Sequence, residues 1–177
     1  MKILSEAESR TFYRVLTDSI DPRDTFLQLL FETGARVSES LTLGEDDLVG
    51  ASLTIRPLKN SNPRVVTLSS GLVAKLRRLP PGRWSRSLAE TVRLDSVRRS
   101  LTRHFHQRTK TLLGRRLNLH SLRHTAFSRL YVASKDLLLV KQWAGHKSIN
   151  STLVYLRVNN QEEANRTAQD ILKSFGT

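Results

Sequence analysis

The sequence predicts a mostly helical α+β domain with one small antiparallel sheet. Most of the 177 residues lie in segments whose apolar residues recur three or four positions apart, as on one face of a helix. Residues 47–69 instead alternate apolar and polar side chains on both sides of a turn at 60–63. Because this sheet is small and antiparallel, a doubly wound fold is excluded.

Capping residues set the helix boundaries in the first part of the chain. Ser5, followed by a glutamate three residues later, predicts a helix that runs to about residue 18. Asp21 and Pro22 are typical of the start of a second helix, and Gly34 is typical of its end. This second helix is strongly apolar and is expected at the centre of the core.

Helices are also expected through most of the remaining chain. The segment 83–94 has no clean period and is expected to be a loop. The expected helices are 72–79, 95–113, one that begins at His120, one from Asp136 to Gly145, a short one over 152–156, and an amphipathic one over 161–175.

The charge balance indicates a polyanionic partner. The chain has 29 Lys and Arg against 16 Asp and Glu, a formal net charge of +13. This favours nucleic acid, with an anionic membrane surface or a merely basic soluble protein as alternatives. Four cationic residues near the hairpin and on the long helix are candidates for DNA backbone contacts. They are Arg56, Arg64, Arg99 and Arg103.

Composition also excludes several classes of protein. The chain has no cysteine, so neither a disulfide framework nor a cysteine-based zinc site is expected. No apolar run approaches the roughly 20 residues of a membrane span, and the first four residues are too short for a signal peptide. A single soluble domain in the cytoplasm is therefore expected.

Four polar side chains and one phenol form a candidate phosphate site. His120 and Arg123 are three residues apart at a helix start, so they share a face. His146 follows a glycine, and Tyr155 lies nine residues further on. Arg36 precedes a short helix, where it is suited to share an anion with backbone N–H groups. The alternative is a surface Arg36 paired with the glutamate three residues later.

These residue types suit chemistry at a phosphate. Arginine matches two phosphate oxygens at once, and two Arg with two His would stabilise a five-coordinate phosphorus. A phenol is normally protonated at pH 7, and an arginine-rich pocket would favour its ionised, nucleophilic form. Tyr155 is therefore the candidate nucleophile. Lys59, where the first strand runs into the turn, is a candidate to reach a DNA groove.

Taken together, these motifs resemble the catalytic domain of the tyrosine recombinases, the phage-integrase family. The family signature is Arg, Lys, His-x-x-Arg, Gly-His and Tyr, in that order. Here it reads Arg36 (in Thr33–Glu39), Lys59, His120-Ser121-Leu122-Arg123, Gly145-His146 and Tyr155. The resemblance covers nearly the whole chain.

The resemblance implies a role for each residue and no cofactor or metal. Arg36 and Arg123 would hold the scissile phosphate, and Glu39 would support Arg36. His120 would act in proton transfer, His146 would bond a phosphate oxygen, and Lys59 would protonate the leaving 5′-hydroxyl. Tyr155 would attack and become linked to the DNA 3′-phosphate. The implied function is site-specific DNA recombination, whether integration, excision, inversion or resolution.

The resemblance also implies how the protein is organised. Residues 1–177 would form one catalytic domain without the N-terminal core-binding domain usual in the family. The partners would be duplex DNA with specific sites, in the nucleoid, and three further copies in a tetramer. The helix expected over 161–175 would dock on a neighbouring protomer or fold back on its own core.

Three other functions agree with parts of the same sequence. His120 and His124 are four residues apart, a spacing that binds zinc on a helix, although no convincing third ligand is evident. A DNA-binding module without catalysis would use the same basic surface. A DNA-relaxing enzyme like the type IB topoisomerases would share the tyrosine chemistry without partner protomers.

Overall fold

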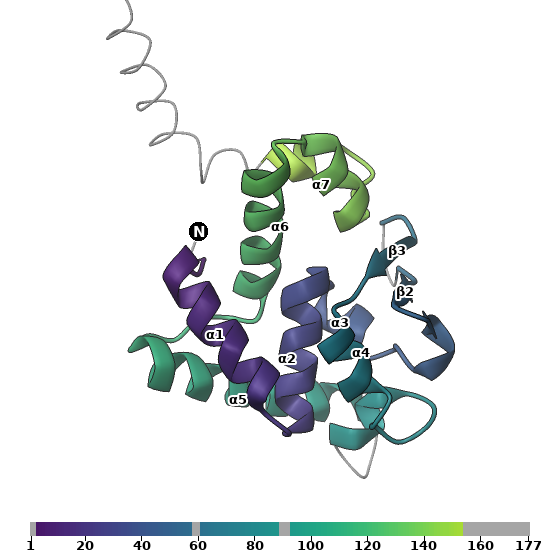
Figure 1. Cartoon of the computed structure of the whole chain (residues 1–177), viewed down its shortest axis with the longest axis vertical. Helices are drawn as coiled ribbons and strands as arrows, with labels where there is room; N and C mark the ends of the chain where they lie inside the picture. Colours follow the sequence, from purple (N-terminus) through teal and green to yellow (C-terminus); the bar gives the residue numbers. More distant parts are fainter. Residues whose placement is uncertain (1–2, 58–60, 89–92, 154–177) are drawn as a thin grey trace, which may run out of the picture.

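The structure is a computed structural model that describes residues 3–57, 61–88 and 93–153. Its helices and strands, most of them labelled in Figure 1, are α1 (Glu6–Asp18), α2 (Pro22–Thr33), α3 (Val37–Ser40), η1 (Glu45–Asp47), β1 (Leu48–Val49), β2 (Ser52–Ile55), β3 (Arg64–Thr67), α4 (Ser70–Leu76), η2 (Trp84–Leu88), α5 (Leu94–Leu113), α6 (His120–Ser134) and α7 (Leu137–Ala144). The sheet is antiparallel, in the order β1-β2-β3. The predicted fold class is confirmed.

The predicted helix ends are present as capping interactions. Ser5 Oγ accepts the Glu8 N–H at 3.2 Å, and the Glu8 carboxylate accepts the Ser5 N–H at 2.8 Å. Asp21 caps α2, which begins with a proline. Gly34 ends α2 with a positive φ of 62°, and its N–H donates to Leu30 O at 3.0 Å.

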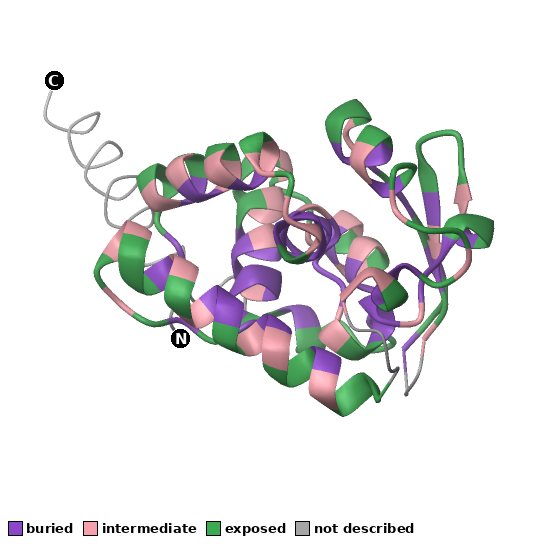
Figure 2. Cartoon of the chain, turned by 90° about the horizontal axis from the view of Figure 1, so that it is seen from below, coloured by how far each residue is buried: buried purple, intermediate pink, exposed green. Residues whose placement is uncertain are grey.

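Helix α2 is the centre of the hydrophobic core. Its residues from Asp24 to Phe31 are all buried, so it meets protein on every side. It packs against α1, α4, α5 and α6. Buried residues line the inward sides of the surrounding helices, and exposed residues lie on their outer sides (Figure 2).

The sheet lies over residues 48–67, as predicted, with Leu53 paired to Val66. The segment 83–94 differs from the predicted loop because residues 84–88 form a turn of 3₁₀ helix. Trp84 in this turn is buried, and its backbone N–H donates to the backbone oxygen of Leu43 at 3.1 Å. The burial of this one large aromatic side chain holds the segment in place. A helix of five residues is too short to show a repeating pattern of apolar residues, so the sequence does not indicate it.

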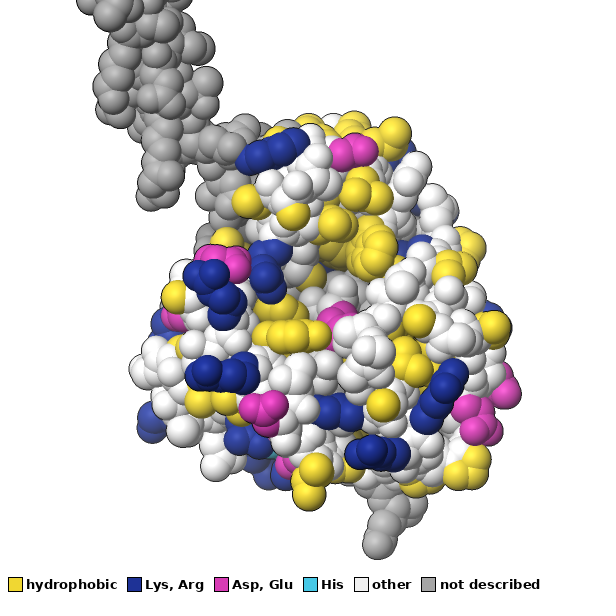
Figure 3. Space-filling view, in the orientation of Figure 1, with side chains coloured by type: hydrophobic (Ala, Val, Ile, Leu, Met, Phe, Trp, Pro, Cys, Tyr) yellow, Lys and Arg dark blue, Asp and Glu magenta, His cyan; other side chains and the backbone are white. Residues whose placement is uncertain are grey.

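A second, smaller hydrophobic cluster lies between α6 and α7. It contains Phe127, Val140 and Ala144, and Trp143 packs against both this cluster and the main core. Figure 3 shows a hollow, lined by hydrophobic side chains, between α6–α7 and the body below. Residues 150–153 are helical, and the remainder of the helices expected over 152–156 and 161–175 lies outside the described residues. No helix in the described residues is long and apolar enough to cross a membrane.

A buried ion cluster joins α2 to α5. The Asp24 carboxylate is fully buried and accepts bonds from Ser19 Oγ at 2.6 Å and from the Arg108 guanidinium; His104 Nε2 lies 2.7 Å from it. Burial opposes ionisation of Asp24, but these bonds outweigh it and lower its pKa to about 2. Asp21, Asp24 and His104 come close enough to hold a cation, yet arginines already bond both carboxylates, which indicates a structural cluster.

We expect Asp24→Asn to lower the free energy of unfolding at pH 7 by about 3 kcal/mol, because it removes the fully buried carboxylate charge to which Arg108 and His104 are bonded. A carboxyl with a depressed pKa stabilises the fold above its unfolded value of 3.8 and loses that effect as pH falls towards about 2. The destabilisation should therefore shrink below about pH 4. Urea unfolding at several pH values measures it, with the exposed Asp46→Asn as control; equal losses in both variants contradict the prediction.

Candidate active site

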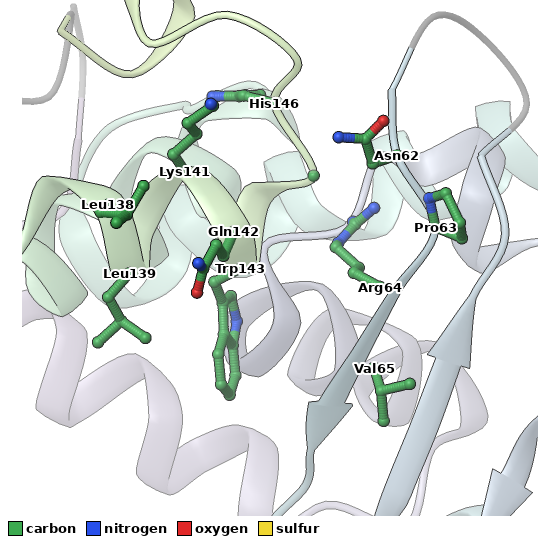
Figure 4. Close-up of a pocket in the computed structure, with 11 residues that line it drawn as sticks. Asn62, Pro63, Arg64, Val65, Leu138, Leu139, Lys141, Gln142, Trp143 and His146 are labelled. Atoms are coloured by element: carbon green, nitrogen blue, oxygen red, sulfur yellow. The ribbon is translucent and has the colours of Figure 1, made fainter.

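The candidate site is assembled from four segments that lie far apart in the chain. They are the start of α3, the β2–β3 hairpin, the first turn of α6 and the loop after α7. Packing of α2 on α6 and of α7 on β3 brings them together. Figure 4 shows the hairpin residues Asn62 and Arg64 facing α7 and His146 across a cavity of about 450 Å³.

Arg36 is held by its own helix start and by the hairpin. Its backbone N–H donates to Glu39 Oε2 at 3.0 Å, and its Nη1 donates to Glu39 Oε1 at 2.9 Å. Nη1 also donates to Ser61 Oγ at 3.2 Å. The side chain stays 36% exposed, so the guanidinium is fixed on one side and accessible on the other. Glu39 thus lies where the sequence placed it, behind Arg36.

Arg64 does not lie where the sequence placed it. Its side chain is only 3% exposed, and its Nη2 donates to Glu39 Oε2 at 2.9 Å. A guanidinium in this position is bonded inside the protein, so the structure gives no support to the predicted DNA contact. Burial opposes ionisation of Glu39, but the charge of Arg64 and the bonds from both arginines outweigh it and lower the pKa of that carboxyl.

Arg123 is buried in the first turn of α6 and bonds the ends of two other helices. Its Nη1 donates to Gly34 O at 2.6 Å, and its Nη2 donates to Ala144 O at 3.3 Å. Gly34 ends α2, and Ala144 is the last residue of α7. The carbonyl end of a helix carries partial negative charge, which stabilises a cation there. Arg123 is thereby fixed to the core.

The Phe127 ring packs against the Arg123 guanidinium and leaves no room for a side chain at position 34. The Arg123 guanidinium carbon lies 4.6 Å from the centre of the Phe127 ring, a cation–π contact. A Cβ atom at Gly34 would lie 2.6 Å from that same ring. Because the position also has a positive φ, glycine is required twice over.

His146 lies against Arg123 and is neutral. Its Nε2 is 2.9 Å from Arg123 Nη2, and arginine only donates, so Nε2 accepts and Nδ1 carries the proton. Nδ1 then donates to Thr152 Oγ1 at 3.0 Å. Burial, followed by the charges of Arg123, Arg36 and Arg64, lowers the pKa of His146 to about 4.

His120 shares this electrostatic environment. Burial and then the charges of Arg123 and Arg36 lower the pKa of His120. His124, one turn along α6, makes an edge contact with the His120 ring at 4.5 Å between ring centres, and burial is the main cause that lowers its pKa to about 4. Within the described ranges, this pair belongs to no group of three possible metal ligands. The geometry therefore gives the zinc alternative no support.

Gly145 allows the hairpin to dock beside His146. The Asn62 N–H donates to Gly145 O at 2.9 Å, and a Cβ at Gly145 would lie only 2.7 Å from Asn62 O. The residue has a positive φ of 66°. The glycine before His146 thus serves the close approach of two backbones.

The other cationic residues predicted to contact DNA lie on the surface. The Arg56 side chain is 70% exposed and pairs with Asp47. Arg99 and Arg103 are exposed on α5. Lys59 and Tyr155, the predicted acid and nucleophile, lie outside the described residues.

Comparison with known proteins identifies the family. A family model described as "Phage integrase family" matches residues 2–162. This chain belongs to the phage integrase family. A probable integrase/recombinase protein of Methanocaldococcus jannaschii is 28% identical over 98% of the chain and 54% of its own length. The tyrosine recombinase XerC of Pseudomonas entomophila is 31% identical over 83% of the chain and 52% of its own length.

Solved structures show that the fold is that of the tyrosine-recombinase catalytic domain. The crystal structure of the XerH site-specific recombinase bound to palindromic difH substrate matches with a TM-score of 0.74 and 19% identity. That match covers 94% of this chain and 52% of the other. This phage-integrase family member spans about half the length of the relatives it matches.

Sequence reasoning missed the supporting residues Ser61, Arg64 and Thr152. Alternation along β3 would have found Arg64, because it shares the inward phase of the strand with the buried Val66. The hydroxyl contacts of Ser61 and Thr152 depend on tertiary packing, and no local pattern indicates them.

We expect Gly145→Ala to destabilise this family member by at least about 1 kcal/mol more than Gly114→Ala, because only the first adds a steric clash. Both glycines have a similar positive φ, 66° and 68°, but a Cβ at Gly114 meets nothing within 4 Å. Chemical denaturation of both variants measures the difference. Equal losses would mean that the hairpin is not held against position 145.

We expect the His146 ring to titrate near pH 4, measured by NMR of the ring protons. The unfolded chain, with a histidine pKa of about 6.5, then binds more protons than the folded chain between these values. The free energy of unfolding should fall as pH drops from about 6.5 towards 4, and His146→Gln should reduce that slope. A ring midpoint at or above about pH 6 contradicts the prediction.

Proposed function

We propose that this chain is the catalytic domain of a site-specific DNA recombinase that cleaves and rejoins strands through a covalent 3′-phosphotyrosyl intermediate. The observation that carries the proposal is the convergence of two arginines on two neutral histidines. Arg123 Nη2 lies 2.9 Å from His146 Nε2, and Arg36 bonds Ser61 of the hairpin whose next residue, Asn62, bonds Gly145 beside His146. His120 is in the same turn of α6 as Arg123, and both arginines lower the pKa of both histidines. Such a set of cations and donors suits one phosphate.

In the proposed reaction the arginines bind the non-bridging oxygens of the scissile phosphate. The Tyr155 oxygen attacks phosphorus, which forms a P–O bond to tyrosine and breaks the bond to the 5′-oxygen. His120 takes the proton that the Tyr155 hydroxyl loses on attack, and Lys59 gives a proton to the leaving 5′-oxygen, which departs as a hydroxyl. One phosphate ester is exchanged for another, so no metal, nucleotide or other cofactor is needed. Attack by a 5′-hydroxyl reverses the step.

His146 needs a change of partner to bond the phosphate. In the free site its Nε2 accepts from Arg123, so it has no proton to offer there. When Arg123 Nη2 turns to a phosphate oxygen, the ring is free to carry its proton on Nε2 and to donate it to the phosphate. The Thr152 hydroxyl donates or accepts equally well, so it bonds Nδ1 in either tautomer.

The proposed partner is duplex DNA with specific sites, approached through Arg56, Arg99 and Arg103. The solved XerH structures are complexes with difH substrate, and a solved Tn1549 transposon integrase structure is a complex with circular intermediate DNA, which supports a DNA partner here. A tetramer on paired sites, with docking through residues 161–175, and a location in the nucleoid belong to the same proposal. So does the assignment of residues 1–177 as a single catalytic domain. The outcome would be integration, excision, inversion or resolution.

The decisive experiment is capture of the covalent adduct. Wild-type protein incubated with nicked duplexes should yield a protein–DNA species that survives denaturing electrophoresis, because the nick lets the cleaved end diffuse away. Tyr155→Phe should abolish this species and retain DNA binding. Tyr131→Phe, a change of the same type on α6, should leave it in place. Sequencing the attached DNA gives the site.

Three results would contradict the proposal. Attachment that survives in Tyr155→Phe removes this residue as nucleophile. Binding without attachment in the wild type indicates a non-catalytic DNA-binding module. Relaxation of a supercoiled plasmid without recombinant product indicates a DNA-relaxing enzyme.

A further inference from the structure

Arg64 is a buried cation whose position is unusual for its charge. It lies on β3, with its side chain 3% exposed and its Nη2 bonded to Glu39. Within the described residues, its Nε and Nη1 have no hydrogen-bond partner. Burial of an arginine with two unsatisfied donors costs stability, and an apolar residue of similar size would often stabilise the fold more. Stability alone therefore does not explain an arginine here.

The contacts of Arg64 point to a role in orientation. The Glu39 carboxylate is divided between two arginines. Oε1 accepts from Arg36 Nη1, whereas Oε2 accepts from Arg64 Nη2 and from the Arg36 N–H. Arg64 therefore fixes the plane of the carboxylate from the side opposite Arg36 Nη1. Without it, Glu39 Oε2 would keep only the Arg36 N–H, and the carboxylate would lose its bond to a cation outside the Arg36–Glu39 pair.

Arg64 also borders the loop that carries His146. A Cβ added at Gly145 would lie 3.3 Å from Arg64 Nη1 and 3.4 Å from its Cδ. Two residues before Arg64, the Asn62 N–H donates to Gly145 O. Figure 4 shows the Arg64 side chain between the hairpin and the α7 end, on the cavity that His146 also lines. The Arg64 side chain thus bonds Glu39, the partner of Arg36, and lies beside Gly145, the residue before His146.

We propose that Arg64 is a positioning residue that, through Glu39, orients Arg36 for phosphate binding and makes that orientation depend on the docked hairpin. The inference rests on the proposed function only for its consequence in cleavage. When the hairpin is docked on Gly145 through Asn62, Arg64 holds Glu39, and Glu39 holds Arg36. When the hairpin leaves, Glu39 loses Arg64 and Arg36 loses its fixed direction.

The test observes Arg36 directly and cleavage separately. In ¹⁵N-resolved NMR spectra, the side-chain Nε–H signal of Arg36 is assigned by its loss in Arg36→Lys. Arg64→Met should broaden or shift this signal in a folded protein, as should Glu39→Gln, and the double variant should add little. Arg10→Met, which removes an exposed arginine on α1, should leave it unchanged. Arg64→Lys keeps the charge and should recover part of the signal, and it carries the test if Arg64→Met does not fold.

Cleavage provides the second measurement. Arg64→Met should slow adduct formation by roughly 10- to 100-fold, the size typical of a residue that supports a site residue, with little change in DNA affinity. An unchanged Arg36 signal in folded Arg64→Met and Arg64→Lys overturns the inference, whatever the DNA assay gives. An equal loss of binding and cleavage also overturns it. If wild-type protein forms no adduct while Arg36 still loses its order, the proposed function fails and the positioning role stands.

Discussion

The site depends on the bond between the buried Arg123 guanidinium and two helix-terminal carbonyl groups. Gly34 O belongs to the end of the central helix α2, and Ala144 O belongs to the end of α7. A charge removed from water needs compensating dipoles, and helix ends supply them without adding a carboxylate. The cation is therefore held by neutral groups and keeps its full charge for a ligand. Its anchor is the hydrophobic core itself, so the stability of α2 sets the precision of the site.

The remaining charges are arranged to leave the site electropositive. Glu39 is shared by Arg36 and Arg64, so two buried or half-buried cations have one carboxylate between them. Burial, followed by the charges of Arg123 and Arg36, lowers the pKa of His120 and of His146. A net positive, partly desolvated site lowers the stability of the protein without a ligand, and the same charge stabilises an anion that binds there. The fold accepts this local cost at the position where chemistry is proposed.

The parts of the structure predictable from sequence were those determined within a few residues. The cap at Ser5, the stop at Gly34 and the pairing of Arg36 with Glu39 each need neighbours no more than four positions away. The burial of Arg64 was missed because its partner lies 25 residues away and its charge suggested the surface. The family signature brought together Arg36, His120, Arg123 and His146, whose common location comes from tertiary packing. Lys59 and Tyr155 remain predictions.

Trp143 can serve as a fluorescence probe of the loop that carries His146. It is one of two tryptophans in the chain and packs against both the main core and the small cluster of α6 and α7. The other, Trp84, is 2% exposed and distant in sequence. With Trp84 replaced by phenylalanine, the indole emission of this protein would come from a single ring at the junction of the two clusters. Any movement of α7 against the main core would then change the wavelength and the intensity of the Trp143 fluorescence as it occurs.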